Sequence, residues 1–209
     1  MAGELRPGHG AKTVDVDLHP QLLLAAYAQG VFPMAHENGD LYWYDPDPRA
    51  IIPLERFHVP SRLARTVRQA PFDIRIDQAF RRVMELCAAP AAGRQETWNS
   101  DELLTAYTEL HHLGYAHSVE AWSGDELVGG LYGVTLNSLF AGESMFSLRR
   151  DASKVALVHL VRRLQRRRYL LLDIQFKTEH LAQFGAVEIA RSRYKQLLLL
   201  ALQRPNSFY

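Results

Sequence analysis

Two polar sites interrupt otherwise apolar stretches of this sequence. In LFAGESMF, Glu143 is the one carboxylate between apolar residues, and in YLLLDIQF, Asp173 and Gln175 stand two positions apart. Burying an acid costs free energy unless it has a partner, which is often a ligand. Residues two apart on a strand share a face, so Asp173 and Gln175 are expected to point the same way. The chain is expected to turn at Gly142 in LFAGESMF. If LFAGESMF and YLLLDIQF form two strands joined by a helix, their polar residues could form a single pocket.

The residue types favour a reaction that depends on positioning rather than on covalent catalysis. Ser144 and Ser147 lack a neighbouring His with an orienting acid, and Cys87 falls on the apolar face of an expected helix. What remains is one acid, one acid–amide pair and aromatic surfaces. Such a set suits transfer from an already activated donor to an amine, which needs proximity and electrostatic stabilisation.

The sequence gives little support for a cofactor or a metal ion. His111 and His112 are adjacent and would point to different helix faces, and no Cys or carboxylate accompanies them or His117 at ligand spacing. The P-loop pattern GxxxxGK[ST] does not occur in the sequence. SLRRDAS, just before an expected helix, is a poor version of an acetyl-CoA pyrophosphate loop. We therefore expect no cofactor and no metal.

Two groups of arginines are candidate contacts for nucleic acid. The formal net charge is only +1, so such binding must come from local patches. Arg62, Arg65 and Arg68 recur every three residues and share one helix face. The second group crowds the end of a later helix and consists of Arg162, Arg163, Arg166, Arg167 and Arg168. Both groups could instead be solvated faces, and the second also complements the helix dipole.

The expected elements form an α/β (α+β) fold with a mixed, largely antiparallel sheet. Helices are predicted over 20–29, 61–69, 78–87, 101–113, 152–167, 177–183 and 191–203, with Ser61, Asp77, Ser100 and Asp151 as caps. Strands are predicted over 72–76, 117–122, 127–136, 139–146, 169–176 and 186–189. The segment 30–53 is dense in aromatic residues, Gly and Pro, which excludes one long regular element there.

Cysteine content and hydropathy predict a cytoplasmic protein that does not insert into a membrane. The lone Cys87 excludes an internal disulfide and fits a reducing compartment. No N-terminal run combines a basic end with an apolar core, as a secretory signal would. The longest apolar runs are far shorter than the ~20 residues that span a bilayer.

Ordered motifs along most of the chain resemble one family. They are GVFPM, WYDPDPR, FHVPSRLARTVR, TWNSDELLTAYTELHHLGYAHSVEAW, ELVGGLYGV, LFAGESMFS, DASKVAL, LLDIQF and HLAQFGAVEI. Over residues 18–194 the sequence closely resembles the leucyl/phenylalanyl-tRNA–protein transferases. The resemblance implies transfer of Leu or Phe, and also Met, from aminoacyl-tRNA to a protein with N-terminal Arg or Lys, which marks that protein for N-degron degradation. It also implies a small N-terminal domain, 1–47, and a GNAT-like catalytic domain, 48–209; we expect a monomer.

The resemblance assigns roles to individual residues. Asp173 and Gln175 match a D-x-Q pair credited with catalysis, and Glu143 matches a glutamate that meets the cationic acceptor. The positions matching the aminoacyl and adenosine pocket are Met34, Trp98, Phe140, Met145 and Phe146. The departures from the family pattern are Met34 for Trp, Asn99 for Ile, Ile174 for Cys and Ala190 for Pro.

The implied donor is an ester and the implied acceptor is an α-amine. Gln175 would orient the amine, because an amide oxygen accepts hydrogen bonds but has no useful basicity. Asp173 is expected to hold and polarise the Gln175 amide NH₂, while the proton passes to the leaving 3′-oxygen. Two other classes stay open: a GNAT-type acyl-CoA enzyme, and a non-catalytic tRNA-binding or adaptor protein.

Overall fold

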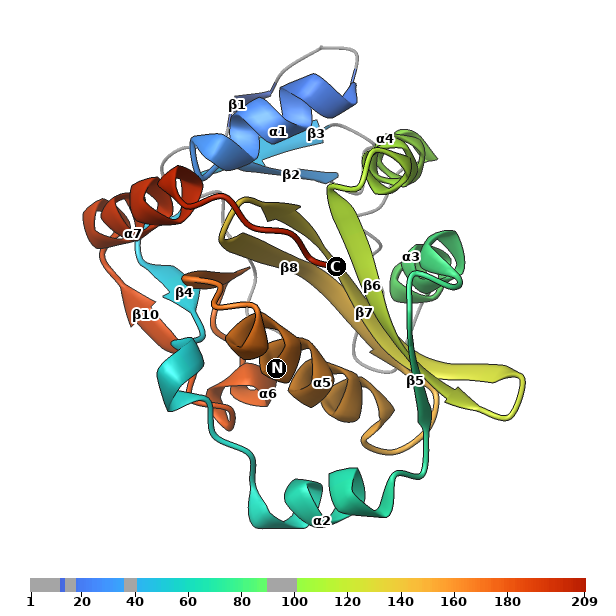
Figure 1. Ribbon diagram of the computed structural model, residues 1–209. Coiled ribbons are helices and arrows are strands. Elements are labelled where there is room, and N and C mark those ends of the chain that lie inside the picture. Colours follow the sequence, from blue (N-terminus) through green and yellow to red (C-terminus); the bar gives the residue numbers. More distant parts are fainter. Residues whose placement is uncertain (1–11, 14–17, 36–40, 90–100) are drawn as a thin grey trace.

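The computed structural model describes residues 12–13, 18–35, 41–89 and 101–209, and its strands form two sheets (Figure 1). The small sheet has the strand order β1-β3-β2, and the large one has the order β10-β4-β9-β8-β7-β6-β5. Within these described strands, only β8 and β9 pair in parallel. The predicted α/β fold with a mixed, largely antiparallel sheet is therefore confirmed.

The small sheet comes from the aromatic N-terminal segment. Its strands are β1 (Lys12–Thr13), β2 (Phe32–Ala35) and β3 (Leu41–Tyr44), and helix α1 (Pro20–Ala28) lies beside them. Pro20 begins α1, where its missing N–H would have no helical partner. Gly30, with φ of +73°, turns the chain from α1 into β2. Short strands thus replace one long element, as expected, and the domain boundary at residue 47 stays a prediction.

The large sheet brings the two polar motifs onto neighbouring strands. Its strands are β4 (Arg49–Ile51), β5 (Asp73–Ile76), β6 (Ala116–Ser123), β7 (Glu126–Leu136), β8 (Leu139–Ser147), β9 (Leu171–Gln175) and β10 (Val187–Ile189). Strands β6, β7 and β8 form the predicted antiparallel meander. Helix α5 (Ala152–Arg166) then crosses from β8 to β9, as parallel neighbours require. Ala141 pairs with Asp173 in this ladder, so the polar ends of the two strands meet.

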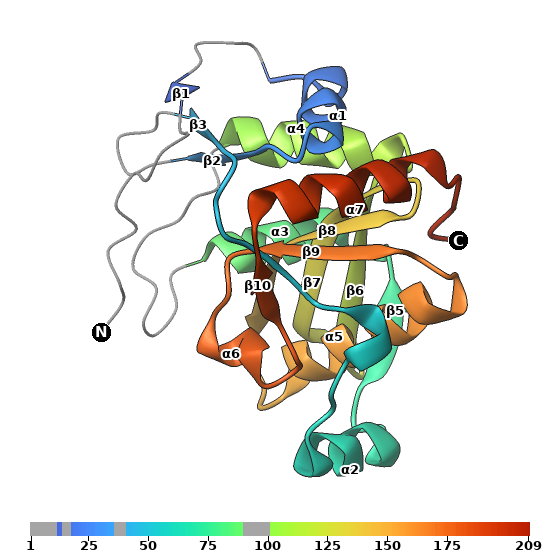
Figure 2. The same cartoon turned by 90° about the vertical axis from the view of Figure 1, so that its left-hand side faces the viewer.

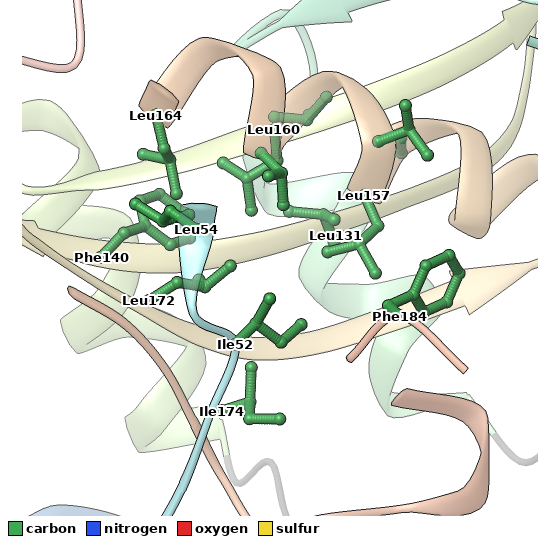
Figure 3. Close-up of a cluster of buried hydrophobic side chains, with 14 of the residues drawn as sticks. Ile52, Leu54, Leu131, Phe140, Leu157, Leu160, Leu164, Leu172, Ile174 and Phe184 are labelled. Atoms are coloured by element: carbon green, nitrogen blue, oxygen red, sulfur yellow. The ribbon is translucent and has the colours of Figure 1, made fainter. Parts of the chain in front are cut away.

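Helices cover both faces of the large sheet (Figures 1 and 2). The other helical elements are η1 (Leu54–Arg56), α2 (Ser61–Gln69), α3 (Phe80–Ala88), α4 (Asp101–His112), α6 (Glu179–Ala182) and α7 (Arg191–Gln203). One apolar cluster joins α1, α3 and α4 to the sheet, and another lies beneath α5. Figure 3 shows the second cluster, in which Leu157, Leu160 and Leu164 of α5 face the sheet. No helix in the described ranges is long and apolar enough to cross a membrane.

Two predicted helix caps are wrong, and a third residue occupies its predicted cap position without a side-chain cap bond. Ser61 is the first residue of α2, whose N-cap position is Pro60. Asp77 lies ahead of α3, and its carboxylate accepts a hydrogen bond from the Ser118 N–H at 2.7 Å instead. Asp151 is the N-cap residue of α5, as predicted, but it has φ of +64° and its side chain makes no cap bond. Its carboxylate pairs with Lys154 at 3.1 Å instead. Residues distant in the sequence decide which donor a short carboxylate binds, so residue spacing alone does not predict the partner of such a carboxylate. The fourth predicted cap, Ser100, lies outside the described residues.

Candidate active site

A β-bulge sits at Glu143, in the middle of β8. Tyr132 pairs with Ser144 and Gly133 pairs with Gly142, so Glu143 is an extra residue without a partner across the ladder. The strand continues through this point, and the predicted turn at Gly142 is wrong. Such bulges bend the strand locally and re-aim a side chain, and they are common beside active sites.

Neutral hydrogen-bond donors hold the side chain of Glu143. Its Oε1 accepts from the Tyr27 hydroxyl at 2.7 Å and from Gln175 Nε2 at 3.2 Å. The hydroxyls of Tyr27 and Tyr107 share a further hydrogen bond, and both tyrosines are buried. Burial, the largest cause, raises the pKa of Glu143 to about 8 although the Tyr27 bond opposes the rise. The ionised form of Glu143 is therefore less favourable than that of an exposed glutamate.

Asp173, in contrast, is paired with a buried cation that the sequence analysis did not identify. Arg49 Nε and Nη2 donate to the two Asp173 carboxylate oxygens at 2.9 and 2.6 Å, and neither residue is exposed. The Tyr194 hydroxyl adds a third donor at 2.8 Å. Burial alone would lower the pKa of Arg49, but the adjacent Asp173 raises it overall. Arg49 belongs to the WYDPDPR motif, and nothing in its spacing linked it to Asp173.

Gln175 ends β9 in a left-handed conformation, with φ of +56°. The Phe176 N–H donates to the Ile174 carbonyl at 2.6 Å, which closes a three-residue turn around Gln175. The Gln175 amide NH₂ donates to Glu143, whereas Asp173 accepts from the Gln175 backbone N–H at 3.0 Å. The predicted contact between Asp173 and the Gln175 amide NH₂ is therefore wrong. The polar residues of the two strands meet through this Gln175–Glu143 contact, while the predicted pocket stays a prediction.

The residues predicted to line the aminoacyl pocket do not share one surface. Phe140 and Met145 belong to the cluster beneath α5, in which Phe140 is fully buried. Phe146 belongs to the cluster on the opposite face, against which Met34 packs. The bulge at Glu143 shifts the alternation of side chains along β8, so Phe146 lies on the opposite face of the sheet from Phe140 and Met145. Trp98 lies outside the described residues, as does Asn99.

The two arginine groups differ in how free their side chains are. Arg62, Arg65 and Arg68 are exposed on α2, and none of them forms an ion pair with another described residue. Arg162 and Arg166 are likewise exposed near the end of α5. Burial and these two neighbouring cations lower the pKa of His159.

Arg163 differs from its neighbours on α5. Its Nε donates to the Phe208 carbonyl at 2.7 Å. Its guanidinium lies over the ring of Phe208 at 4.8 Å and over that of Tyr209 at 5.4 Å. Arg163 therefore holds the C-terminal segment against α5 and is engaged within the protein.

The fold brings His111 and His117 together with a carboxylate, contrary to the sequence expectation. Potential ligand atoms of Asp77, His111 and His117 lie within 4.8 Å of one another. His117 Nδ1 bonds Asp77 at 2.6 Å, and its Nε2 faces the Gly114 carbonyl at 3.1 Å. His111 Nδ1 bonds the Ala116 carbonyl at 2.9 Å. Hydrogen bonds within the protein account for this cluster, so we assign it a structural role.

The match to a protein family over most of the chain defines the class of this protein, which is an aminoacyltransferase. Residues 51–199 match the family described as leucyl/phenylalanyl-tRNA protein transferase, and residues 16–47 match its N-terminal domain. The chain belongs to the leucyl/phenylalanyl-tRNA protein transferase family.

Three bacterial relatives carry the same description, leucyl/phenylalanyl-tRNA–protein transferase. The protein from Herpetosiphon aurantiacus is 61% identical over 192 residues, which is 91% of this chain and 98% of that one. Those from Phenylobacterium zucineum and Caulobacter vibrioides are 60% and 57% identical over 189 residues, covering 90% of this chain and 86% and 87% of theirs. Among solved structures, L-PGS from Bacillus licheniformis aligns with a TM-score of 0.45 and 11% identity, over 88% of this chain and 77% of that one.

Proposed function

We propose that this protein moves Leu or Phe, and also Met, from aminoacyl-tRNA to the N-terminal Arg or Lys of acceptor proteins, in the cytoplasm. The product would enter the N-degron route to degradation. The observation that carries the proposal is the contact at 3.2 Å between Gln175 and Glu143. It joins the GESMF and LLDIQF motifs in a chain of this family. Family membership supports the classes of donor and acceptor.

Gln175 orients the attacking amine in this mechanism. Its Nε2 donates to Glu143, which leaves the amide oxygen to accept a hydrogen bond from an α-amine. The amine nitrogen attacks the ester carbonyl carbon, so that a C–N bond forms and the bond to the 3′-oxygen of the tRNA breaks. The amine proton passes to that leaving oxygen. Asp173 acts indirectly, because Arg49 and Tyr194 already hold its carboxylate.

Glu143 receives the cationic acceptor residue. The described donors to Glu143, Tyr27 and Gln175, are neutral. Burial destabilises the ionised carboxylate and raises the pKa of Glu143 to about 8, although Arg49 and the Tyr27 bond oppose the rise. A guanidinium or ammonium group would form a charge-assisted hydrogen bond and stabilise the ionised carboxylate. A neutral N-terminal residue offers no such compensation, so Glu143 favours Arg and Lys.

The donor side chain is assigned to the apolar cluster beneath α5, next to Met145 and Phe140. Met145 is partly buried in this cluster and so lies at its boundary. Apolar pockets discriminate by only about 1–3 kcal/mol per methylene, so Leu, Phe and Met should all be accepted. Met34 and Trp98 remain our proposed contacts for the terminal adenosine, and we propose no role in the pocket for Phe146.

In this proposal, exposed arginines on two helices bind the phosphates of the tRNA. Those of α2 are Arg62, Arg65 and Arg68, and those near the end of α5 are Arg162 and Arg166. Their freedom from carboxylates within the described residues suits contacts with phosphate. Arg163 was predicted to join them, but its contacts with Phe208 and Tyr209 favour a structural role.

The direct test is transfer of labelled Leu from leucyl-tRNA to an Arg-initiated peptide. We expect product with the wild-type chain and a much lower turnover rate with Gln175→Ala, while aminoacyl-tRNA binding changes little. Loss of tRNA binding with an intact single-turnover rate would contradict the role of Gln175. Binding of tRNA without peptide-bond formation would favour the adaptor class. Acetyl-CoA binding in a calorimeter would favour the acyl-CoA class.

A further inference from the structure

The backbone at Gln175 adopts a conformation that a glutamine does not favour by itself. A φ of +56° is uncommon outside glycine, and the turn closed by Phe176 N–H and Ile174 O fixes it at the end of a buried strand. Such a conformation persists only where the surroundings determine it. It also sets the direction of the Gln175 amide, which contacts Glu143. The question is therefore which residues hold this turn.

Asp173 is the group that holds the turn. Its Oδ1 accepts a hydrogen bond at 3.0 Å from the backbone N–H of Gln175, which is the central residue of the turn. The same carboxylate accepts from Arg49 Nε, Arg49 Nη2 and the Tyr194 hydroxyl. A carboxylate has about four lone-pair sites, so these four bonds use its capacity. Asp173 therefore has no oxygen left for a substrate.

Arg49 fixes the position of that carboxylate. Its guanidinium lies between the rings of Phe32 and Tyr194, with its central carbon 4.7 and 4.5 Å from their centroids. Its remaining Nη1 donates to the Gly30 carbonyl at 3.0 Å. These contacts come from the α1–β2 connection, from β2 and from α7, so Arg49 is held on several sides. The planar guanidinium, held between two rings, donates two hydrogen bonds that fix the orientation of the Asp173 carboxylate. A lysine ammonium lacks this planar pair of donors.

We propose that Arg49 is a positioning residue for the transfer reaction: through Asp173 it holds Gln175 in its left-handed turn and so aims the catalytic amide. This inference rests on the role proposed above for Gln175. In this proposal the Asp173 carboxylate connects Arg49 to the backbone of Gln175. The small N-terminal sheet then supports the active site, because Phe32 of β2 packs on Arg49. The rival view is that the Arg49–Asp173 pair serves stability alone.

Arg49→Lys is the first variant for the test, because it keeps the charge but loses the fork and the fit between the rings. We expect the single-turnover rate of leucyl transfer to fall by about 10–100-fold, as a displacement of an orienting group by about 1 Å does. KM for aminoacyl-tRNA and for the peptide should stay nearly unchanged. The double variant Arg49→Lys with Gln175→Ala should transfer Leu at the same rate as Gln175→Ala alone. Both changes remove the same contribution, which is the correctly oriented Gln175 amide.

Tyr194→Phe offers a milder variant that should fold, and Tyr169→Phe is its matched control. Both tyrosines are buried and each hydroxyl makes a 2.8 Å bond, to Asp173 in one case and to Thr135 in the other. Only Tyr194→Phe should lower the transfer rate. Hydrogen exchange provides a second readout: in Arg49→Lys, exchange should quicken in the peptide 171–178 while β7 keeps its protection.

The outcomes separate the two proposals. If the wild-type chain transfers no Leu, the proposed function fails. If Gln175→Ala is fully active, the role of Gln175 fails whatever Arg49 does. If Gln175→Ala is impaired but Arg49→Lys keeps the wild-type rate in the folded state, only the positioning role is overturned. A double variant that loses the product of the two single losses would also overturn it, because Arg49 would then act independently of Gln175.

Discussion

The two carboxylates of the site lie on neighbouring strands but in opposite surroundings. Asp173 is fully buried and accepts hydrogen bonds from Arg49 and Tyr194. Glu143 contacts neutral donors, Tyr27 and Gln175, and burial raises its pKa to about 8. The contacts of Asp173 therefore fix it within the fold, whereas we propose that Glu143 is the carboxylate that receives a cation. We therefore propose that their different partners give these two acids different roles, with Asp173 supporting the fold and Glu143 selecting the substrate.

Removing the fixed charge should have the largest effect. Asp173→Ala leaves the Arg49 guanidinium buried without its carboxylate, so the free energy of unfolding should fall by about 3–5 kcal/mol. Urea denaturation measures this loss. Glu126→Ala is the matched control, because Glu126 pairs with Arg149 at 3.0 Å where both side chains are more than half exposed. Its cost should be about 0–1 kcal/mol. Similar losses in both variants would remove the distinction between an anchoring carboxylate and a solvated one.

The next effect concerns substrate selection by Glu143. Glu143→Gln keeps the size of the side chain but loses its charge, and a hydrogen bond to a charged group contributes about 1.5–3 kcal/mol. Transfer to Arg- and Lys-initiated peptides should therefore slow by about 10–100-fold. Affinity for a minimal aminoacyl-adenosine donor should change less, and discrimination against a neutral N-terminal residue should narrow. Competing charged and neutral peptides in one assay decides the point. Equal losses for both peptides, with weaker donor binding, would move Glu143 into the donor pocket.

A third effect is a dependence of stability on pH. The folded-state pKa of Glu143 is about 8 against an ordinary value of 4.5, so between these values the folded protein binds more protons than the unfolded chain. Stability from this group is thus present below pH 4.5 and is lost as the pH rises towards 8. Glu143→Gln does not titrate, so its Tm relative to the wild type should increase from pH 5 to pH 8.5. Each kcal/mol corresponds to about 2–4 °C in a protein of this size. A Tm difference that does not change with pH would show that Glu143 is not destabilised by burial.

Sequence reasoning located the strands of the site because polar residues inside apolar runs stand out. Glu143, Asp173 and Gln175 were found in this way, and both motifs lie on strands, with Asp173 and Gln175 on β9. The final helix, Arg191–Gln203, also ends where its leucine pattern ends. These features depend on residues close together in the chain.

What the sequence did not contain is the pairing between distant segments. Arg49 and Asp173 are 124 positions apart, and Tyr27 reaches Glu143 across 116 positions. A bulge adds one residue to a strand without changing its composition, so the face of Phe146 could not be read from alternation. Hydrogen-bond partners and register are tertiary properties, and they decide that Asp173 pairs with Arg49 while Glu143 contacts Tyr27 and Gln175.

The α2 arginines, which form no ion pair with another described residue, contrast with Arg49, which pairs with Asp173. Arg62, Arg65 and Arg68 are exposed on α2, so we expect their charges to be available to tRNA phosphates. Each contacting arginine replaced by alanine should weaken all aminoacyl-tRNAs alike and reduce the slope of log K against log salt by ~1. Arg81→Ala with Arg82→Ala is the control, since both side chains are exposed on α3 but pair with Glu85 at 3.3 and 3.1 Å. Filter binding across a salt series should show a shallower slope for the α2 triple variant and an unchanged one for the α3 pair. If the slopes agree, the α2 face is solvated, and the phosphates must be bound elsewhere, with Arg162 and Arg166 on α5 as the next positions to replace.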